Sequence, residues 1–170
     1  MKIAVFNGSP RKENTSAMVQ AFREGAEAAG HEVAEYQVGR MKIAGCMACE
    51  YCHTKGEGAC VQKDDFEKIL PAYKEADMIV FASPIYYFVM TAQMEAAIQR
   101  LCCIGKPLKA KKGALLLSSH SPGVYDAAIA QFKGFTAYVN MENTGVITAH
   151  GDENKSANKM NEIREFAKKL

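Results

Sequence analysis

The chain has 170 residues, of which 48% are hydrophobic and 24% charged, and its formal net charge is +2. This length fits one domain with its own core, and the composition favours neither disorder nor a broad nucleic-acid surface. No apolar stretch approaches the ~20 residues of a membrane span, and the first residues lead into a strand-like segment instead of a secretory signal. We therefore expect a soluble, cytoplasmic protein with a single domain over residues 1–170.

Cysteine is the unusual part of the composition. The six cysteines divide into a group of four within fifteen positions and an adjacent pair, namely Cys46, Cys49, Cys52 and Cys60, and Cys102 and Cys103. In a small secreted protein this count would indicate a disulfide framework. In a cytoplasmic domain with its own core, clustered cysteines favour metal or redox chemistry.

Four short apolar runs lack the alternation of a strand with one exposed face. They are typical of parallel strands buried on both faces and cover residues 3–6, 78–82, 114–117 and 146–147. A fifth segment, residues 33–38, is more mixed and suits an edge strand. Between these segments apolar residues recur at a helical period, which predicts helices around residues 18–26, 66–73, 94–101, 125–132 and 160–170.

The alternation of strands and helices predicts an α/β fold with a doubly wound, five-stranded parallel sheet in the order 2-1-3-4-5. A cysteine loop over residues 45–61 is inserted after the second strand. The side chains of residues 14–16 are predicted to cap the first helix, and Gly30 to end it. Pro71 predicts a kink or a restart in the second helix.

The loop after the first strand has the composition of an anion site. Glycine allows a tight turn, and free amides at a helix start attract negative charge. The loop adds neutral donors and one charged donor, which come from Ser9, Asn14, Thr15, Ser16 and Arg11. It matches neither a Walker loop nor a GxGxxG fingerprint. Its place at the predicted switch point favours phosphate binding over the alternative, a plain strand-to-helix turn.

Several motifs resemble one known family. Gly8-Ser9-Pro10-Arg11-Lys12 followed by Asn14-Thr15-Ser16 is similar to the FMN phosphate loop of the NADPH-dependent FMN reductase and iron–sulfur flavoprotein group. The resemblance continues through residues 63–66, 82–87, 90–94 and 98–100. It implies a flavodoxin-like fold, bound FMN, chemistry centred on the flavin without a catalytic side chain, and a homodimer or homotetramer.

The sequence also departs from that family pattern. The phosphate loop is one residue shorter, with only Glu13 between Lys12 and Asn14. Phe88-Val89 stands where the family commonly has glycine and a small polar residue, and Gln99 replaces the usual Asp. The first and last departures are compatible with FMN binding, whereas the second bears on the flavin edge and on substrate access.

Two further loops follow the third and fourth strands at the same predicted edge. In the resembled family the first of them lines the isoalloxazine, so we expect Pro84, Ile85, Tyr86, Tyr87 and Phe88 near the ring, with Pro84 fixing the turn. The alternative for these aromatics is a hydrophobic corner or an oligomer contact. In the second loop, Ser119 and His120 are placed to reach the flavin carbonyls or the ribityl chain, although a lone loop histidine is often only solvated.

The spacing Cys46-x2-Cys49-x2-Cys52-x7-Cys60 predicts a four-iron four-sulfur cluster, because three closely spaced thiolates and a fourth beyond a glycine-rich turn can hold its corners. It matches the compact motif of iron–sulfur flavoproteins. A zinc site and a cluster-free FMN protein with free thiols are the alternatives, while the compartment disfavours a disulfide. Cys102 and Cys103 are predicted to be core residues.

The sequence therefore predicts a flavin-dependent oxidoreductase that relays electrons through a cluster to or from a one-electron carrier such as ferredoxin. NAD(P)H is a further candidate reductant. One alternative is a cluster-free NAD(P)H-dependent FMN or quinone reductase. Another is a non-enzymatic electron carrier or redox sensor whose cysteine loop changes shape on oxidation.

Overall fold

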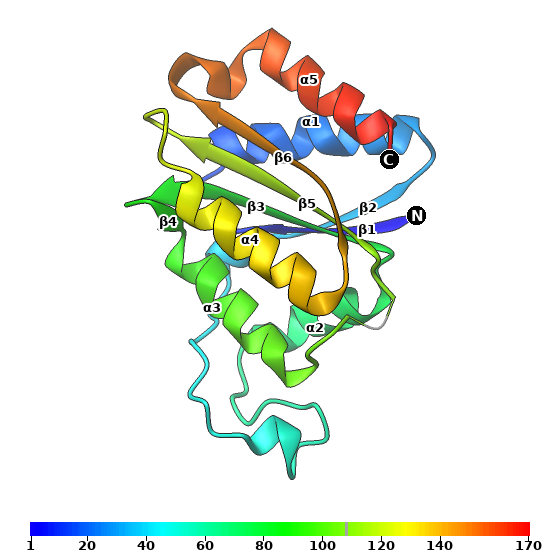
Figure 1. Ribbon diagram of the computed structural model, residues 1–170, viewed down its shortest axis with the longest axis vertical. Helices are drawn as coiled ribbons and strands as arrows, with labels where there is room; N and C mark the ends of the chain where they lie inside the picture. The colour runs from blue at the N-terminus through cyan, green and yellow to red at the C-terminus, as the bar shows by residue number, and fades with distance from the viewer. Residues whose placement is uncertain (108) are drawn as a thin grey trace.

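Five parallel strands form the centre of the computed structural model, which describes residues 1–107 and 109–170. They follow one another across the sheet in the order β2-β1-β3-β5-β6 (Figure 1). Helices connect parallel neighbours, as such crossovers require, and the predicted doubly wound α/β fold is confirmed. The strand bounds are β1 Lys2–Asn7, β2 Glu32–Tyr36, β3 Met78–Tyr86, β5 Lys112–Ser119 and β6 Glu142–His150.

The sequence pattern does not predict the sixth strand. β4 (Val89–Met90) pairs antiparallel with the end of β3, where Tyr86 lies opposite Val89. This short strand changes the strand labels, but the five parallel strands alone keep the predicted order 2-1-3-4-5. β2 lies at one edge of the sheet, as its mixed composition predicts.

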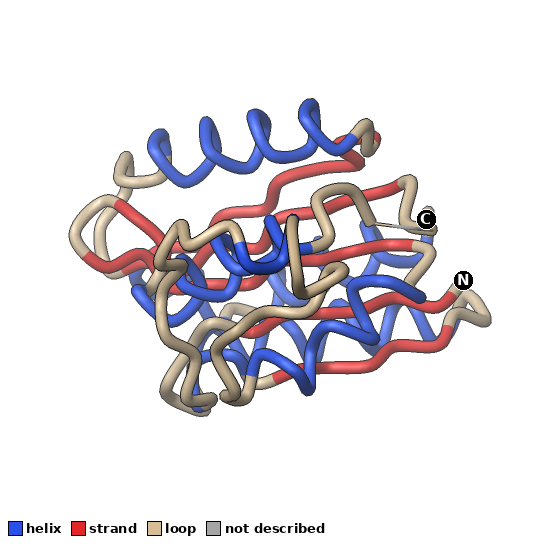
Figure 2. Tube along the Cα trace, turned by 90° about the horizontal axis from the view of Figure 1, so that it is seen from below, coloured by secondary structure: helices blue, strands red, loops and turns tan. Residues whose placement is uncertain are grey.

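Helices cover both faces of the sheet. On one face α1 (Asn14–Ala28) packs against α5 (Ala157–Lys168), and on the other lie α2 (Phe66–Glu75), α3 (Ala92–Arg100) and α4 (Asp126–Val139) (Figure 1). The two chain ends lie on the same side of the molecule (Figures 1 and 2). No helix in the described part of the chain is long and apolar enough to cross a membrane. Short 3₁₀ turns occupy Val38–Arg40, Tyr51–His53, Leu101–Cys103 and Gly151–Lys155.

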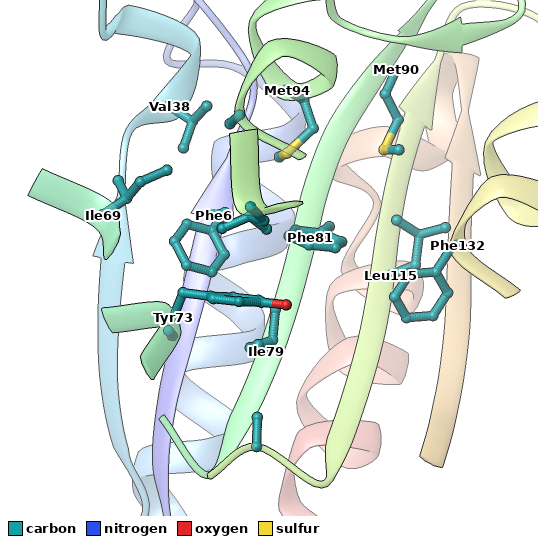
Figure 3. Close-up of a cluster of buried hydrophobic side chains, with 14 of the residues drawn as sticks. Phe6, Val38, Ile69, Tyr73, Ile79, Phe81, Met90, Met94, Leu115 and Phe132 are labelled. Carbon is teal, nitrogen blue, oxygen red and sulfur yellow. The ribbon is translucent and has the colours of Figure 1, made fainter. Parts of the chain in front are cut away.

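A hydrophobic cluster on each face explains the unbroken apolar runs. Within β1, Ile3 and Val5 belong to the cluster under α1 and α5, whereas Ala4 and Phe6 belong to the cluster under α2, α3 and α4. Phe81 of β3 lies near the middle of the second cluster, with its ring centroid 5.9 Å from that of Phe6 (Figure 3). Since successive side chains point to opposite faces, burial of both faces requires apolar residues at every position.

The predicted helix ends and interruptions agree only in part with the structure. Gly30 follows α1 at φ +81°, the left-handed conformation expected of a glycine that ends a helix. α2 continues through Pro71 and does not restart. Pro71 is exposed, whereas Phe66, Ile69 and Tyr73 are buried, so packing of that face offsets the backbone hydrogen bond that the proline removes.

Candidate functional site

Buried neighbours shape the loop between β1 and α1. Asn7 is fully buried; its Oδ1 accepts from the Ser9 amide at 3.0 Å and its Nδ2 donates to Glu35 at 2.9 Å. Ser9 Oγ donates to the Arg11 carbonyl at 2.8 Å and accepts from the Arg11 amide at 3.2 Å. Gly39 packs so tightly that a Cβ there would lie 2.3 Å from the Ser9 carbonyl carbon. The loop backbone is therefore fixed by the fold around it.

The N-terminus of α1 opens from this loop without a side-chain cap. The N-cap residue is Glu13, whose side chain makes no capping hydrogen bond, and Asn14, Thr15 and Ser16 form the first turn of the helix. The prediction that these three side chains cap the helix is wrong, because the helix begins at the first of them. The first-turn amides stay available for an anion, and Arg11 lines the same cavity.

The end of β3 brings aromatic side chains to this edge of the sheet. Pro84 lies inside β3, opposite Ser118 of β5, so the prediction that it makes the turn is wrong. Tyr87 and Phe88 make the turn into β4, with left-handed φ values of 50° and 73°. Tyr87 is 93% exposed and Phe88 is 57% exposed. The turn therefore displays two rings at a cost in backbone strain.

The end of β5 supplies hydroxyl groups. Ser118 Oγ lies 2.7 Å from Thr15 Oγ1, which joins β5 to the start of α1. Ser119 Oγ lies 2.6 Å from the hydroxyl of Tyr125, which in turn donates to the carbonyl of Ala149. These buried contacts hold the carboxyl ends of β5 and β6 together beside the loop after β1.

A cavity of about 480 Å³ lies where these loops meet, a size typical of small-molecule sites. Its lining includes nine of the twelve residues that the sequence nominates for the cofactor, namely Ser9, Arg11, Asn14, Thr15, Pro84, Ile85, Tyr86, Ser119 and His120. The other three, which do not belong to the lining, are Ser16, Tyr87 and Phe88. The residues that sequence reasoning missed are Glu13, Ser118, Gly151, Asp152 and Asn154.

Asn154 is the most informative of the missed residues. It is buried, and its Nδ2 donates to the carbonyls of Ser119 at 2.7 Å and Gly151 at 2.9 Å. Its Oδ1 is buried without a partner in the described residues, so this side chain next to the cavity keeps one unsatisfied acceptor. The signal in the sequence was position, because Asn154 follows the last strand at the same sheet edge.

The cysteine loop, residues 45–61, lies beyond α2 and α3 as seen from the sheet, and its tip points away from the carboxyl ends of the strands (Figure 1). Apart from one 3₁₀ turn, it contains no regular element. Ala48, Glu50 and Glu57 adopt left-handed φ between 48° and 55°. Such a concentration of strained non-glycine residues is typical of a functional loop.

The thiols of this loop surround one small cavity. Its lining includes all six cysteines together with Arg100. Cys46 Sγ lies 3.9 Å from Cys102 Sγ and accepts from the Ala48 amide at 3.4 Å. In the described part of the chain, however, no three His, Cys, Asp or Glu side chains are gathered closely enough to hold a metal ion.

The adjacent pair of cysteines differs from its prediction. Cys103 is buried, and burial raises the pKa of its thiol to about 11. Cys102 is exposed and faces Cys46, so its assignment to the core is wrong. The reason is the 3₁₀ turn Leu101–Cys103 at the end of α3, which places neighbouring side chains on different sides.

The amino-acid sequence matches the family model of NADPH-dependent FMN reductase over residues 1–150. The chain belongs to this family. Among the relatives of this family member is an iron–sulfur flavoprotein of Archaeoglobus fulgidus, 39% identical over 120 residues, which cover 69% of this chain and 54% of that protein. The chain spans about half the length of this and two further iron–sulfur flavoproteins that it matches.

Solved structures place this FMN reductase family member among flavodoxin-like folds. An NAD(P)H:quinone oxidoreductase from Methanothermobacter marburgensis superimposes with a TM-score of 0.75 at 17% identity, covering 100% of this chain and 96% of that one. A flavodoxin from the domain Archaea gives a TM-score of 0.65 at 19% identity, covering 99% and 95%. At these identities the likeness establishes the fold, and the predicted flavodoxin-like class is confirmed.

Proposed function

We propose that the chain is an FMN-dependent oxidoreductase that exchanges electrons between its flavin and a four-iron four-sulfur cluster. The observation that carries the proposal is that one member of the FMN reductase family has two cavities whose linings differ in chemistry. One is lined by hydroxyls and amides at the strand ends, and the other by thiols. The first suits a phosphorylated ligand, and the second suits iron, a metal that thiolates bind well.

The residues of the strand-end cavity fit FMN. In the proposed complex Ser9, Arg11, Asn14, Thr15 and Ser16 hold the phosphate, with amides at the start of α1 and the Arg11 guanidinium balancing its charge. Asn154 supports this assignment as a buried polar residue of the lining that holds the carbonyls of Ser119 and Gly151 beside the cavity.

The turn between β3 and β4 and the loop that follows β5 complete the proposed flavin site. In the proposed complex Pro84, Ile85 and Tyr86 lie along the ring, and Ser119 and His120 orient the ribityl chain and the carbonyls. Tyr87 and Phe88, exposed on the turn and outside the cavity lining, are proposed to shield the outer edge of the ring. Bound FMN supplies hydride and single-electron transfer. The residues of the chain position the ring and limit the access of water.

The thiol cavity fits a cluster by the chemistry of its donors. Cys46, Cys49, Cys52 and Cys60 are the proposed ligands. Burial raises the pKa of Cys52, so the metal-free loop keeps this thiol protonated and must release protons as it binds iron. Arg100 also belongs to the lining, and its buried Nε–H has no partner in the described residues.

The proposed partners follow from this pair of cofactors. A one-electron carrier such as ferredoxin exchanges electrons at the cysteine loop, and NAD(P)H is a second reductant, in keeping with the family description. We propose that residues 1–170 act as one flavodoxin-like domain and assemble as a homodimer or homotetramer.

The test is the composition and spectrum of anaerobically prepared protein. We expect about one FMN and four irons with four labile sulfides per chain, and a broad absorbance beyond the flavin bands that bleaches with dithionite. Iron and sulfide absent after anaerobic reconstitution, or zinc in their place, would contradict the cluster. Absence of flavin would contradict FMN binding.

A cluster-free NAD(P)H-dependent FMN or quinone reductase is the second candidate. The separation of the thiols favours it, because no group of three His, Cys, Asp or Glu side chains in the described residues is preformed for a metal. Steady-state reduction of a quinone or free FMN by NAD(P)H, at an unchanged rate in a protein without iron, would establish this function instead.

A further inference from the structure

The cysteine loop joins the fold through a narrow neck. The amide of Ala44 donates to Asp64 at 3.0 Å, across the two chain segments that enter and leave the loop. Gln62 Nε2 donates to the Gly45 carbonyl at 3.0 Å. Asp64 thus serves the neck in addition to the start of α2, where it accepts from the Phe66 amide.

Arg100 at the end of α3 bridges both sides of this neck. Its Nη1 donates to the Ala44 carbonyl and to Asp64, each at 2.9 Å. Its Nη2 donates to the Gln62 carbonyl and to Asp64, each at 3.3 Å. The side chain is 1% exposed, and its guanidinium lies 4.7 Å from the centroid of the Phe66 ring. The paired geometry with Asp64 fixes the plane of the guanidinium.

One donor of Arg100 remains. A guanidinium has five N–H donors, and the four named bonds use both Nη groups. Nε is buried without a partner in the described residues, and Arg100 lines the thiol cavity. Although burial lowers it, the Asp64 carboxylate raises the pKa of Arg100, and Cys60 lines the same cavity as Arg100. A buried N–H without an acceptor carries a desolvation penalty, which a sulfur acceptor would relieve.

We propose that Arg100 is a positioning residue of the thiol site: its Nη groups close the neck of the cysteine loop, and its Nε–H donates to the sulfur of a ligand in the cavity that both share. This role rests on one part of the proposed function, namely that the four thiols of the cysteine loop bind a metal. A hydrogen bond and a positive charge at ligand sulfur stabilise the more reduced cluster, so Arg100 raises the reduction potential.

The test uses Co²⁺ alone as the probe of the metal-free protein under anaerobic conditions, since thiolate-to-cobalt charge transfer reports both binding and the electron density on sulfur. Arg100→Lys keeps the charge and loses the Nε–H. We expect it to bind Co²⁺ at least ~10-fold more weakly and to shift the charge-transfer band to longer wavelength. After cluster reconstitution its reduction potential should be more negative. Arg164→Lys, in a remote pair with Glu24, is the matched control and should match the unmodified protein.

A second variant separates the neck from the sulfur contact. Asp64→Asn weakens the neck but leaves the Nε–H in place. It should speed hydrogen exchange in residues 45–61 and leave the charge-transfer band nearly unshifted. If Arg100→Lys shifts neither the band nor the affinity, the sulfur contact is overturned. The absence of any thiolate band in the unmodified protein would overturn it equally.

A third measurement needs no variant and covers the case in which Arg100→Lys does not fold. In ¹⁵N-labelled protein, Zn²⁺ should move the Nε–H resonance of Arg100 downfield and slow its exchange with water. An Nε–H resonance indifferent to Zn²⁺ would overturn the proposal. If these signals appear but no iron–sulfur cluster can be reconstituted, the role of Arg100 stands and the proposed electron relay fails.

Discussion

The strand-end cavity and the cysteine loop differ in what determines their shape. Each wall of the strand-end cavity continues a buried strand, and contacts such as Thr15 with Ser118 at 2.7 Å join one wall to the next. The cysteine loop has no strand within it and relies on the neck around Arg100 and Asp64. The shape of the strand-end cavity is therefore set by the sheet, whereas the cysteine loop is joined to the fold by hydrogen bonds at its two ends, several of them made by Arg100 and Asp64.

The largest expected effect is that of a cysteine substitution, which should remove iron without changing the FMN content. Serine in place of Cys46, Cys49, Cys52 or Cys60 should lower iron to less than about a tenth of the unmodified level, because a corner of the cluster loses its thiolate. FMN content should not change. The measurement is iron, sulfide and flavin per chain after anaerobic reconstitution. Cys102→Ser is the control and should retain iron; iron retained in all four variants would rule out these thiols as ligands.

The next effect concerns the neck. Although burial opposes it, hydrogen bonds from Arg100 and from the amides of Ala44 and Phe66 hold the pKa of Asp64 below its usual value. The stability from this carboxylate is therefore fully present above the usual carboxyl pKa and is lost as the pH falls through the lowered one. Asp64→Asn should cost about 3 kcal/mol at neutral pH, because it removes the carboxylate that balances the charge of a buried guanidinium.

Thermal unfolding and limited proteolysis of residues 45–61 between pH 6 and pH 2.5 check this prediction. The unmodified loop should become sensitive to protease at the acid end, and the Asp64→Asn protein should be sensitive throughout. Asp126→Asn, at the start of α4, provides the control. A variant as resistant as the unmodified chain at neutral pH would show that the neck does not depend on this ion pair.

A smaller effect is expected in the strand-end cavity. Asn154→Leu removes the free acceptor and two donated hydrogen bonds, and we expect FMN to bind about 10-fold more weakly, the equivalent of about 1.4 kcal/mol. Flavin fluorescence titration measures the affinity. The exposed Asn161 on α5 gives a matched control, Asn161→Leu. Unchanged FMN affinity in Asn154→Leu would remove this residue from the site.

The smallest effect tests the strained turn. Phe88→Gly should stabilise the flavin-free protein by about 0.5–1 kcal/mol, because glycine adopts a positive φ without a steric penalty. Phe88→Ala removes the same ring but keeps the strained backbone, so its melting temperature should not rise. If both variants also bind FMN more weakly, the ring contributes to the flavin site; if neither does, only the backbone of the turn matters.

Much of the fold was predictable because strands buried on both faces leave a visible pattern of apolar residues in the sequence. Runs such as residues 114–117 are apolar at every position, since both faces of the sheet are covered. The hairpin of β3 and β4 was not predictable, because Tyr87 and Phe88 occupy left-handed positions that glycine or asparagine usually fill. Pro84 was a misleading turn signal, since it lies within β3.

The candidate sites also contain residues that the sequence could predict and residues that it could not. Ser9, Arg11 and Thr15 could be named from the loop that follows a buried strand. Asn7 and Asn154 could not, because their importance lies in buried hydrogen bonds to segments distant in the sequence.

By itself, the sequence determined the strand and helix alternation, the polar composition of the loop after β1 and the spacing of four cysteines, since each is a local pattern. The six cysteines indicated redox or metal chemistry, but the sequence did not show where the adjacent pair, Cys102 and Cys103, lies relative to the other four. Only the tertiary structure decided that Cys102 faces Cys46 and that Arg100 closes the neck, because α3 and the loop meet across more than fifty residues of chain. Contacts of that kind depend on how helices pack on a sheet, and no local pattern records them.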